Sequence, residues 1–577
     1  MSLATSLPST TTDAVRELRL TMRGPALVES DHEYDSVRRI WNGTVDRRPA
    51  VIARCVDDLD VMAAVRCARR YGLPLSVLGG GHDWAGRALR DGGLVIDLGA
   101  MRRVRVDPET ATASVQGAAR AGEVLAAARP HGLAPVTGVI NKVGLTGLTL
   151  GGGYGLLGGR HGLASDNLIS ADVVLADSGK VTASETENPD LYWALRGGGG
   201  NFGIVTEARF RLHPVSTVQA GLLLFPLSQA AAVLHRYQEL ISAAPDDLTI
   251  MAGFFGGPDG VPLLFLLPVW CGDAREAEPW VARVRGLGTP VSGQVDVMSY
   301  PDVLSLFDPS IVDGRHNEMR TRWVPALTDD AIDIIVDAMS RVTSPFTGLF
   351  LHNFHGAATR VAPADTAFAL RRDHLLVEIC AAWEPATCDD GGAAHRHWAR
   401  DLSADLAQHA LPGGYPNLLG TDEQERVTVA FGPNAARLLA VADRYDPDGV
   451  FNAVASVRPD TAALGQNGHA PGHNGTCPTV ETIRFKLRDG VRDAEFRVLN
   501  QRVQDEYMAL RPGFLSRQTS QSADGEYLVV VHWASEEDAR ATMGSFFSAP
   551  ETQGFLGAVD TGTVESGSYA LVPGPRV

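Results

Sequence analysis

The fold of this chain follows from one stretch, Leu75-Ser76-Val77-Leu78-Gly79-Gly80-Gly81-His82, in which an apolar run leads into three glycines and a histidine. The apolar run predicts a strand, and the glycines predict a loop whose backbone N–H groups no side chain covers. Such a nest of N–H groups suits a pyrophosphate. Because a glycine triplet alone is more often a tight turn, its meaning depends on the sequence around it.

The sequence on both sides of this loop predicts two α+β units. The first has apolar, strand-like runs and one amphipathic helical segment: strands at 50–53, 75–78 and 94–98, and a helix at 57–71. The second extends over 104–213, with a predicted helix at 120–129 and predicted strands at 172–175 and 202–212.

Two further glycine-rich stretches lie in the second unit. One is 144–155, which contains Gly151-Gly152-Gly153-Tyr154-Gly155, and the other is 197–203, which leads into a strand. The chain has 61 glycines in 577 residues, more than the usual share of ~7%. Three clusters within one span are difficult to explain as turns, so we expect bare backbone to approach a ligand there.

The composition excludes several classes of function. A chain of 577 residues predicts several domains. Lys+Arg number 51 against 68 Asp+Glu, and the net charge of -17 would repel nucleic acid and an anionic membrane surface. The N-terminus shows no apolar signal segment, no apolar run approaches ~18 residues, and six scattered cysteines form no CxxC pair. These features predict a cytoplasmic protein with reduced thiols and with neither membrane nor nucleic acid as a partner.

The rest of the chain predicts three further parts. Residues 215–430, where strand-like runs separate amphipathic helices, are expected to form a substrate-binding domain. Residues 460–479 have the Gly, Asn and His composition of a linker, which cannot bury enough apolar surface to order itself. Residues 480–577 follow the ferredoxin-like order strand, helix, strand, strand, helix and strand, with the second helix at 535–547 and the last strand near 562–571.

Several short motifs follow one another in order between residues 31 and 459. They are Tyr34-Asp35, Trp41-Asn42, the Gly-Gly-Gly-His loop, Gly93-Leu94-Val95-Ile96-Asp97-Leu98, the run Gly151 to Gly155, Asp190-Leu191-Tyr192-Trp193-Ala194-Leu195-Arg196-Gly197 and Tyr445-Asp446-Pro447-Asp448-Gly449-Val450-Phe451-Asn452. This order resembles the berberine bridge enzyme-like branch of the vanillyl-alcohol oxidase flavoprotein family. The resemblance implies an α+β fold with a two-part, PCMH-type FAD-binding domain over 31–214, an antiparallel-sheet substrate domain, and a return segment to the FAD domain over 431–459.

The resemblance also implies the cofactor, FAD attached covalently through His82 to the flavin 8-methyl group. The alternative is a loop histidine that only contacts a phosphate. Many relatives have a second attachment cysteine where this chain has Ile140, so we expect a single bond. Val143 occupies the place thought to admit O2, which favours an oxidase. The residues expected at the cofactor are Gly79, Gly80, Gly81, His82, Val143, Gly144, Gly147, Gly151, Gly152, Gly153, Gly155, Gly203, Ile204, Val205 and Asn452. No metal site is expected.

Substrate oxidation also requires a base that takes a proton from the substrate. Tyr415, in a segment similar to the family's Tyr-x-Asn, is the preferred candidate, with Arg371 or the flavin dipoles expected to lower its pKa; the alternative is a packed core tyrosine. Glu378, alone in an apolar strand, is the second candidate if burial raises its pKa. Period-2 alternation leaves open whether Glu378 faces inward or outward. His352, His355 and His374 have no assigned role.

The C-terminal segment 482–571 resembles antibiotic biosynthesis monooxygenase-type domains at Arg511-Pro512-Gly513-Phe514 and His532-Trp533. This resemblance implies a module that forms a homodimer through its sheet. The whole chain is predicted to be an FAD-dependent oxidase of secondary metabolism. Its substrate would be an aromatic or polyketide-like small molecule, in which a carbon bearing a hydroxyl or amine gives a hydride to flavin. The reduced flavin would then convert O2 to H2O2. The alternatives are a second, cofactor-free oxygenation in the C-terminal domain, or a non-catalytic flavin-binding scaffold.

Overall fold

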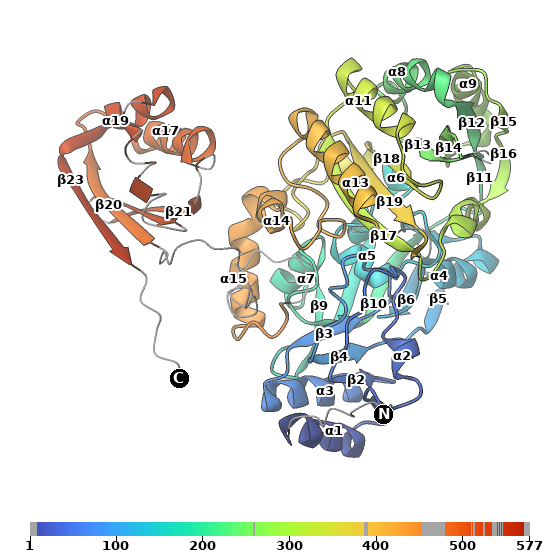
Figure 1. The fold of residues 1–577 in the computed structure, drawn as a ribbon, viewed down its shortest axis with the longest axis horizontal. Helices are drawn as coiled ribbons and strands as arrows, with labels where there is room; N and C mark the ends of the chain where they lie inside the picture. Colours follow the sequence, from blue (N-terminus) through green and yellow to red (C-terminus); the bar gives the residue numbers. More distant parts are fainter. Residues whose placement is uncertain are drawn as a thin grey trace. The chain divides into compact units, whose positions relative to one another are not determined.

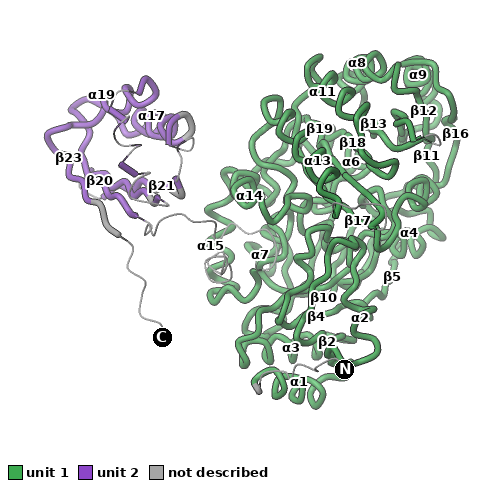
Figure 2. The backbone as a smooth tube through the Cα atoms, viewed as in Figure 1, with its two compact units in different colours: residues 1–460 green, residues 461–577 purple. Residues whose placement is uncertain are grey.

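The chain forms two compact units, residues 1–460 and 461–577, in this computed structural model (Figures 1 and 2). The structure describes residues 9–257, 260–385, 391–452, 479–508, 511, 514–522, 525–533, 539–540, 542, 544, 546–547 and 549–570. The predicted linker lies outside the described residues except for Thr479, and so do Cys388 and Cys477. Within the described part, no helix combines the length and the apolar character that a membrane span requires.

The first sheet of unit 1 ends at the His82 loop. Its strands lie in the order β1 (Ala26–Leu27), β2 (Val51–Arg54), β4 (Leu94–Asp97) and β3 (Leu75–Leu78). Strands β2, β4 and β3 are parallel. Helix α3 (Asp58–Tyr71) starts where Asp57 accepts the N–H of Asp60 and stops at Gly72, whose φ of 63° is left-handed, and α1 (Ser9–Thr21) packs against it. The helix and strands predicted here are confirmed to within about two residues.

The second sheet is antiparallel and has the order β5 (Val104–Asp107), β6 (Thr112–Gln116), β10 (Ile204–His213), β8 (Leu168–Val174) and β9 (Lys180–Ser184), with β7 (Ala134–Pro135) beside β10. Helices α4 (Ala121–Ala128) and α7 (Pro189–Leu195) pack near it. Helix α15 (Ala435–Tyr445) shares the same apolar core, where Leu438 and Val441 are buried with Trp193. Helix α15 therefore returns the chain to the core of the second sheet.

The third sheet is antiparallel, with the strand order β15-β12-β14-β13-β18-β19-β17. The bounds are β11 (Thr217–Ala220), β12 (Leu223–Pro226), β13 (Leu248–Gly256), β14 (Pro262–Trp270), β15 (Ser292–Gly293), β16 (Asp296–Ser299), β17 (His316–Val324), β18 (Gly348–Phe354) and β19 (His374–Trp383), and β11 pairs with β14 and β16. One face packs on α8 (Ala230–Ile241), α9 (Ala274–Arg285), α11 (Asp329–Ser340) and α13 (Ala393–Asp405), of which α8, α9 and α11 lie together in Figure 1.

Alternation along β19 decides which side chains leave that helix-covered core. Leu375, Val377 and Ile379 belong to the core with the helices. Glu378 and Cys380, one residue out of phase, therefore lie on the opposite face of the sheet.

Short helices complete unit 1: α2 (Tyr34–Val37), α5 (Leu145–Leu150), α6 (Gly158–His161), α10 (Tyr300–Leu304), α12 (Ala357–Arg360) and α14 (Gln424–Ala430). Helix α5 corrects the prediction that 144–155 is bare loop. Its first residues are helical because Leu145 and Thr149 bury one side of a turn that starts at Gly144.

Unit 2 is a four-stranded antiparallel sheet with the order β21-β22-β20-β23. Its elements are β20 (Thr479–Leu487), α17 (Asp493–Glu506), β21 (Phe514–Gln521), β22 (Tyr527–Trp533), α19 (Gln553–Ala558) and β23 (Val559–Ala570). Phe485, Phe496 and Phe555 join strands to helices in one core. Of the predicted helix at 535–547, residues 535–538, 541, 543 and 545 lie outside the described part, as do Pro512 and Gly513.

Candidate active site

A cavity of about 700 Å³ lies between the glycine-rich loops and the face of the third sheet opposite its helices. Bare backbone forms one wall, at Gly79 to Gly81, Gly144 and Gly199 to Gly200. A Cβ on Gly80 would lie 2.5 Å from the Cα of Gly144, so only glycine allows the two loops to meet. The volume is within the range of small-molecule and cofactor sites.

His82 stands at this wall as a neutral imidazole. Its ring stacks on Trp41 with the centroids 4.3 Å apart and the planes 15° apart. Burial lowers its pKa to about 4, and the charges of Arg120 and Lys142 act in the same direction. At neutral pH one ring nitrogen therefore keeps a free lone pair, which is the form that can bond to carbon.

Three buried polar atoms at the cavity wall fit a polar cofactor. Among the described residues that line the cavity, the indole N–H of Trp41 and the hydroxyls of Ser76 and Thr146 have no hydrogen-bond partner. Such atoms are costly unless a ligand supplies the partner. With the glycine wall and the neutral His82, they make a site that suits FAD.

Most of the residues predicted at the cofactor line this cavity. They are Gly79, Gly80, Gly81, His82, Val143, Gly144, Gly147, Gly203, Ile204 and Val205. The cavity lining does not include Gly151, Gly152, Gly153, Gly155 and Asn452. For these five, contact with the cofactor stays a prediction.

Close packing explains three of the glycines that lie away from the cavity. A Cβ on Gly155 would lie 1.8 Å from the carbonyl oxygen of Thr137, and one on Gly151 would lie 2.4 Å from the side chain of Asn417. Gly152 has φ of 116°, a conformation that favours glycine. The side chain of Asn452 accepts a hydrogen bond from Arg90 instead of pointing to the cavity.

Tyr415 lies at the cavity with its hydroxyl held by two donors. The backbone N–H of Gly153 and the amide of Asn417 each donate to it over 3.1 Å. Burial raises its pKa to about 12, although both hydrogen bonds act to lower it. Because the hydroxyl accepts two hydrogen bonds, its own proton is free to face a third partner.

Arg371, one of the two groups expected to lower the pKa of Tyr415, binds elsewhere, which corrects that alternative. Arg371 instead forms a bidentate pair with Asp166, both contacts being 2.8 Å, and also donates to Thr366. Its guanidinium is fully buried in that pair. The Tyr415 phenol thus has hydrogen-bond donors but no arginine to favour its anion.

Glu378 faces the cavity, which settles the alternative that its position in the sequence left open. The Nε2–H of His352, on the neighbouring strand β18, donates to its Oε2 over 3.1 Å. His352 also lines the cavity. Sequence analysis missed this histidine, because only the pairing of β18 with β19 brings the two side chains together.

Tyr154 is a second buried phenol at the cavity, and its ring meets that of Tyr415 edge to face at 5.0 Å. The Nδ1–H of His374 donates to the Arg372 carbonyl over 2.7 Å, and burial lowers the pKa of His374 to about 3. The ring is therefore neutral, and its Nε2 accepts the hydroxyl proton of Tyr154 over 2.7 Å. The motif containing Tyr154 was visible in the sequence, but its partner was not.

The part of the cavity away from the glycine loops is mainly apolar. It is lined by Met251, Phe255 and Phe350 of the third sheet and by Phe307, which lies between α10 and β17. The rings of Phe307 and Phe350 meet edge to face at 6.4 Å. An aromatic ring fits such a wall better than a sugar, which would require many hydrogen-bond partners.

Comparison with known proteins finds relatives that bind FAD. Residues 49–184 match the model of the FAD binding domain, and residues 414–458 match the family described as berberine and berberine like. The (R)-6-hydroxynicotine oxidase of Paenarthrobacter nicotinovorans is 32% identical over 457 residues, which are 76% of this chain and 98% of that protein.

Solved structures show the same fold. The crystal structure of 6-hydroxy-D-nicotine oxidase from Arthrobacter nicotinovorans has a TM-score of 0.71 at 30% identity, covering 80% of this chain and 100% of the other. Glucooligosaccharide oxidase from Acremonium strictum, described with a 6-S-cysteinyl, 8α-N1-histidyl FAD, has a TM-score of 0.69 at 26% identity, covering 77% and 99%.

Proposed function

Because the chain belongs to the berberine bridge enzyme-like family of FAD-linked oxidoreductases, we propose that it is an oxidase whose substrate is an apolar, aromatic or polyketide-like alcohol or amine of secondary metabolism. The single observation that carries the substrate class is the apolar wall of Met251, Phe255, Phe307 and Phe350, three of which are aromatic. FAD supplies the hydride acceptor and returns the electrons to O2 as H2O2.

His82 holds FAD in this proposal. Its ring, stacked on Trp41 and neutral, has a nitrogen lone pair that would form the bond to the flavin 8-methyl carbon when FAD is bound. The structurally similar glucooligosaccharide oxidase has both a histidyl and a cysteinyl bond to FAD. Since Ile140 lines the cavity and has no nucleophile, His82 would be the single covalent attachment. Val143 also lines the cavity, and we propose that it admits O2 there.

Two groups compete for the role of base. Tyr415 accepts hydrogen bonds from Gly153 and Asn417, which favour its phenolate against the burial that raises its pKa to about 12. Once its own proton has passed to solvent, the phenolate would take a proton from the substrate hydroxyl or amine. Glu378 has an oxygen not bonded to His352 and faces the same cavity. Tyr415 remains the preferred base. In this proposal Glu378, held by His352, accepts a hydrogen bond from the hydroxyl or amine of the substrate and so positions it.

For unit 2 we propose a ferredoxin-like module that governs association of two chains. Its strand order β21-β22-β20-β23 and its helices α17 and α19 support this proposal. A second oxygenation there is the alternative function.

Substrate profiling tests the proposed oxidase. The FAD-loaded protein is mixed without O2 with a panel of aryl-substituted secondary alcohols and cyclic amines, and in parallel with oligosaccharides of matched concentration. We expect loss of the oxidised flavin absorbance with the aromatic set, followed by H2O2 when O2 is admitted. Reduction only by the oligosaccharides contradicts the substrate class, and reduction by no compound of either set favours the scaffold.

A further inference from the structure

Tyr415 lies in a segment without regular secondary structure. Residues 412–422 form neither helix nor strand, and a single bridge joins Leu411 to Trp323 at their start. Backbone hydrogen bonding alone therefore does not define where the Tyr415 hydroxyl lies. The side chains that contact this segment must do so.

The loop that carries His82 holds the segment from one side. Arg87 donates to the carbonyl oxygens of Pro416 (3.2 Å) and Asn417 (3.1 Å), while its other contacts go to Asp83. The indole N–H of Trp84 donates to the carbonyl oxygen of Leu418 over 3.2 Å. The residues just after Tyr415 are thus hydrogen-bonded to the loop that carries His82.

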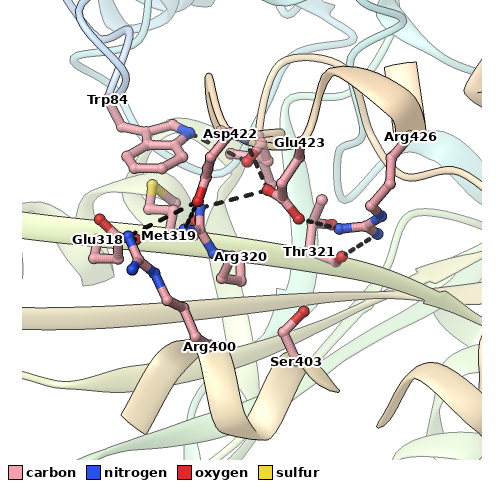
Figure 3. A network of polar contacts seen from close by, with 12 residues as sticks. Trp84, Glu318, Met319, Arg320, Thr321, Arg400, Ser403, Asp422, Glu423 and Arg426 are labelled. Carbon is pink, nitrogen blue, oxygen red and sulfur yellow. Dashed lines mark hydrogen bonds and ion pairs between the residues drawn. The ribbon is translucent and has the colours of Figure 1, made fainter. Parts of the chain in front are cut away.

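Strand β17 holds the segment from the other side through Arg320, whose side chain is only 5% exposed (Figure 3). Its guanidinium contacts Asp422, the last residue of the segment, at 2.8 Å, Glu423, the residue after it, at 3.5 Å, and Glu318 of its own strand at 2.7 Å. Glu423 in turn accepts the backbone N–H of Gly420 over 2.8 Å.

Arg426 completes this network, as Figure 3 shows. It donates to the carbonyl oxygens of Gly413 (2.7 Å) and Thr321 (2.6 Å), and it pairs with Glu423. Three arginines, including Arg400, face three carboxylates, so the network is neutral and its buried members are all paired. A planar guanidinium presents several N–H donors in fixed directions, which suits the contacts of Arg320 with Glu318, Asp422 and Glu423.

We propose that Arg320 and Arg87 are positioning residues that hold the Tyr415 segment from two sides and thereby set the distance between the Tyr415 hydroxyl and the His82 loop. The proposal rests on the proposed function for its catalytic meaning, since Tyr415 is the group being positioned. The two arginines act through the segment and not on the substrate.

The test measures the Tyr415 phenol directly. 3-Fluorotyrosine is incorporated at position 415 of the FAD-loaded protein, and its 19F resonance is followed against pH in the parent, Arg320→Gln and Arg87→Gln. Burial is the largest cause of the raised pKa of Tyr415. We therefore expect both variants to broaden or split the resonance and to lower the titration midpoint by about one unit, because the released phenol gains water.

Arg322→Gln is the matched control. Arg322 lies on the same face of β17, but it donates to the backbone and hydroxyl oxygens of Ser403 on α13 and not to the segment. In Arg322→Gln, the 19F resonance of residue 415 and its titration midpoint are expected to equal those of the parent. If Arg320→Gln and Arg322→Gln change the signal equally, or if Arg320→Gln leaves it unchanged, the proposal is wrong.

Asp422→Asn covers the case in which Arg320→Gln does not fold. Asp422 is 54% exposed, so this variant weakens its ion pairs with Arg320 and Arg400 while retaining the pairs of Arg320 with Glu318 and Glu423. A smaller shift in the same direction supports the proposal, and no shift contradicts it. The 19F signal requires no turnover, so it remains valid if another residue proves to be the base; that question is answered separately by flavin reduction in Tyr415→Phe.

Discussion

Tyr415→Phe removes one hydroxyl, and the structure indicates what that costs in stability and in rate. The N–H of Gly153 is buried and loses its acceptor, whereas the Asn417 amide keeps contacts with the carbonyl oxygens of Gly147 (3.4 Å) and Leu148 (3.3 Å). One buried donor without a partner costs about 1–3 kcal/mol of unfolding free energy. Loss of general base catalysis slows flavin reduction by ~10²–10⁴-fold.

Tyr237→Phe is the control that separates the two effects. The Tyr237 hydroxyl, fully buried in the core of the third sheet, donates to the carbonyl oxygen of Ile250 over 3.0 Å and does not line the cavity. Urea unfolding should show comparable losses of stability for the two variants. Anaerobic stopped-flow mixing with a reducing substrate should show slow flavin reduction only in Tyr415→Phe.

Two results would refute this reasoning. Undiminished flavin reduction in Tyr415→Phe, together with a slow Glu378→Gln, transfers the role of base to Glu378. Equal slowing in Tyr415→Phe and Tyr237→Phe means that the rate follows global stability and not the missing hydroxyl.

Four further predictions concern the cofactor, packing, pH and the second unit. His82→Ala should lose the flavin that otherwise stays with acid-precipitated protein; a yellow, fluorescent band on a denaturing gel of the variant would contradict the attachment. Gly80→Ala should lower the unfolding free energy by about 1–3 kcal/mol, because its Cβ would lie 2.5 Å from Gly144 Cα, whereas Gly158→Ala, with open space around its Cβ, should be nearly neutral in the same urea titration. Burial lowers the pKa of His374 from 6.5 to about 3, so below pH 6.5 the unfolded chain binds a proton that the folded chain does not, and stability falls as pH falls. The loss of unfolding free energy from this group is about 2 kcal/mol at pH 5. His374→Gln should reduce the difference between the unfolding free energies measured in urea at pH 7 and pH 5 by that amount. A chain ended at Pro459 should keep the flavin spectrum while sedimentation shows loss of self-association; loss of the spectrum would show that FAD binding needs residues after 459.

Local sequence was sufficient wherever neighbours in the chain carry the physical cause. The run Leu75 to Leu78 and the glycines after it become strand β3 and a cavity wall because strand propensity and the absence of a Cβ act within a few residues. The helix start at Asp57 is equally local, since its carboxylate accepts the N–H of Asp60. The family resemblance added the role of His82, which its burial and stacking now support.

Tertiary structure alone decided what depends on residues far apart in the chain. The period-2 pattern of β19 allows Glu378 either face, and only helix packing on the side of Val377 and Ile379 directs it to the cavity and to His352. The fate of Arg371 depended on Asp166, 205 residues earlier, which takes its charge away from Tyr415. A charged or polar side chain bonds to the partner that folding brings near, and separation along the chain does not show which partner that is.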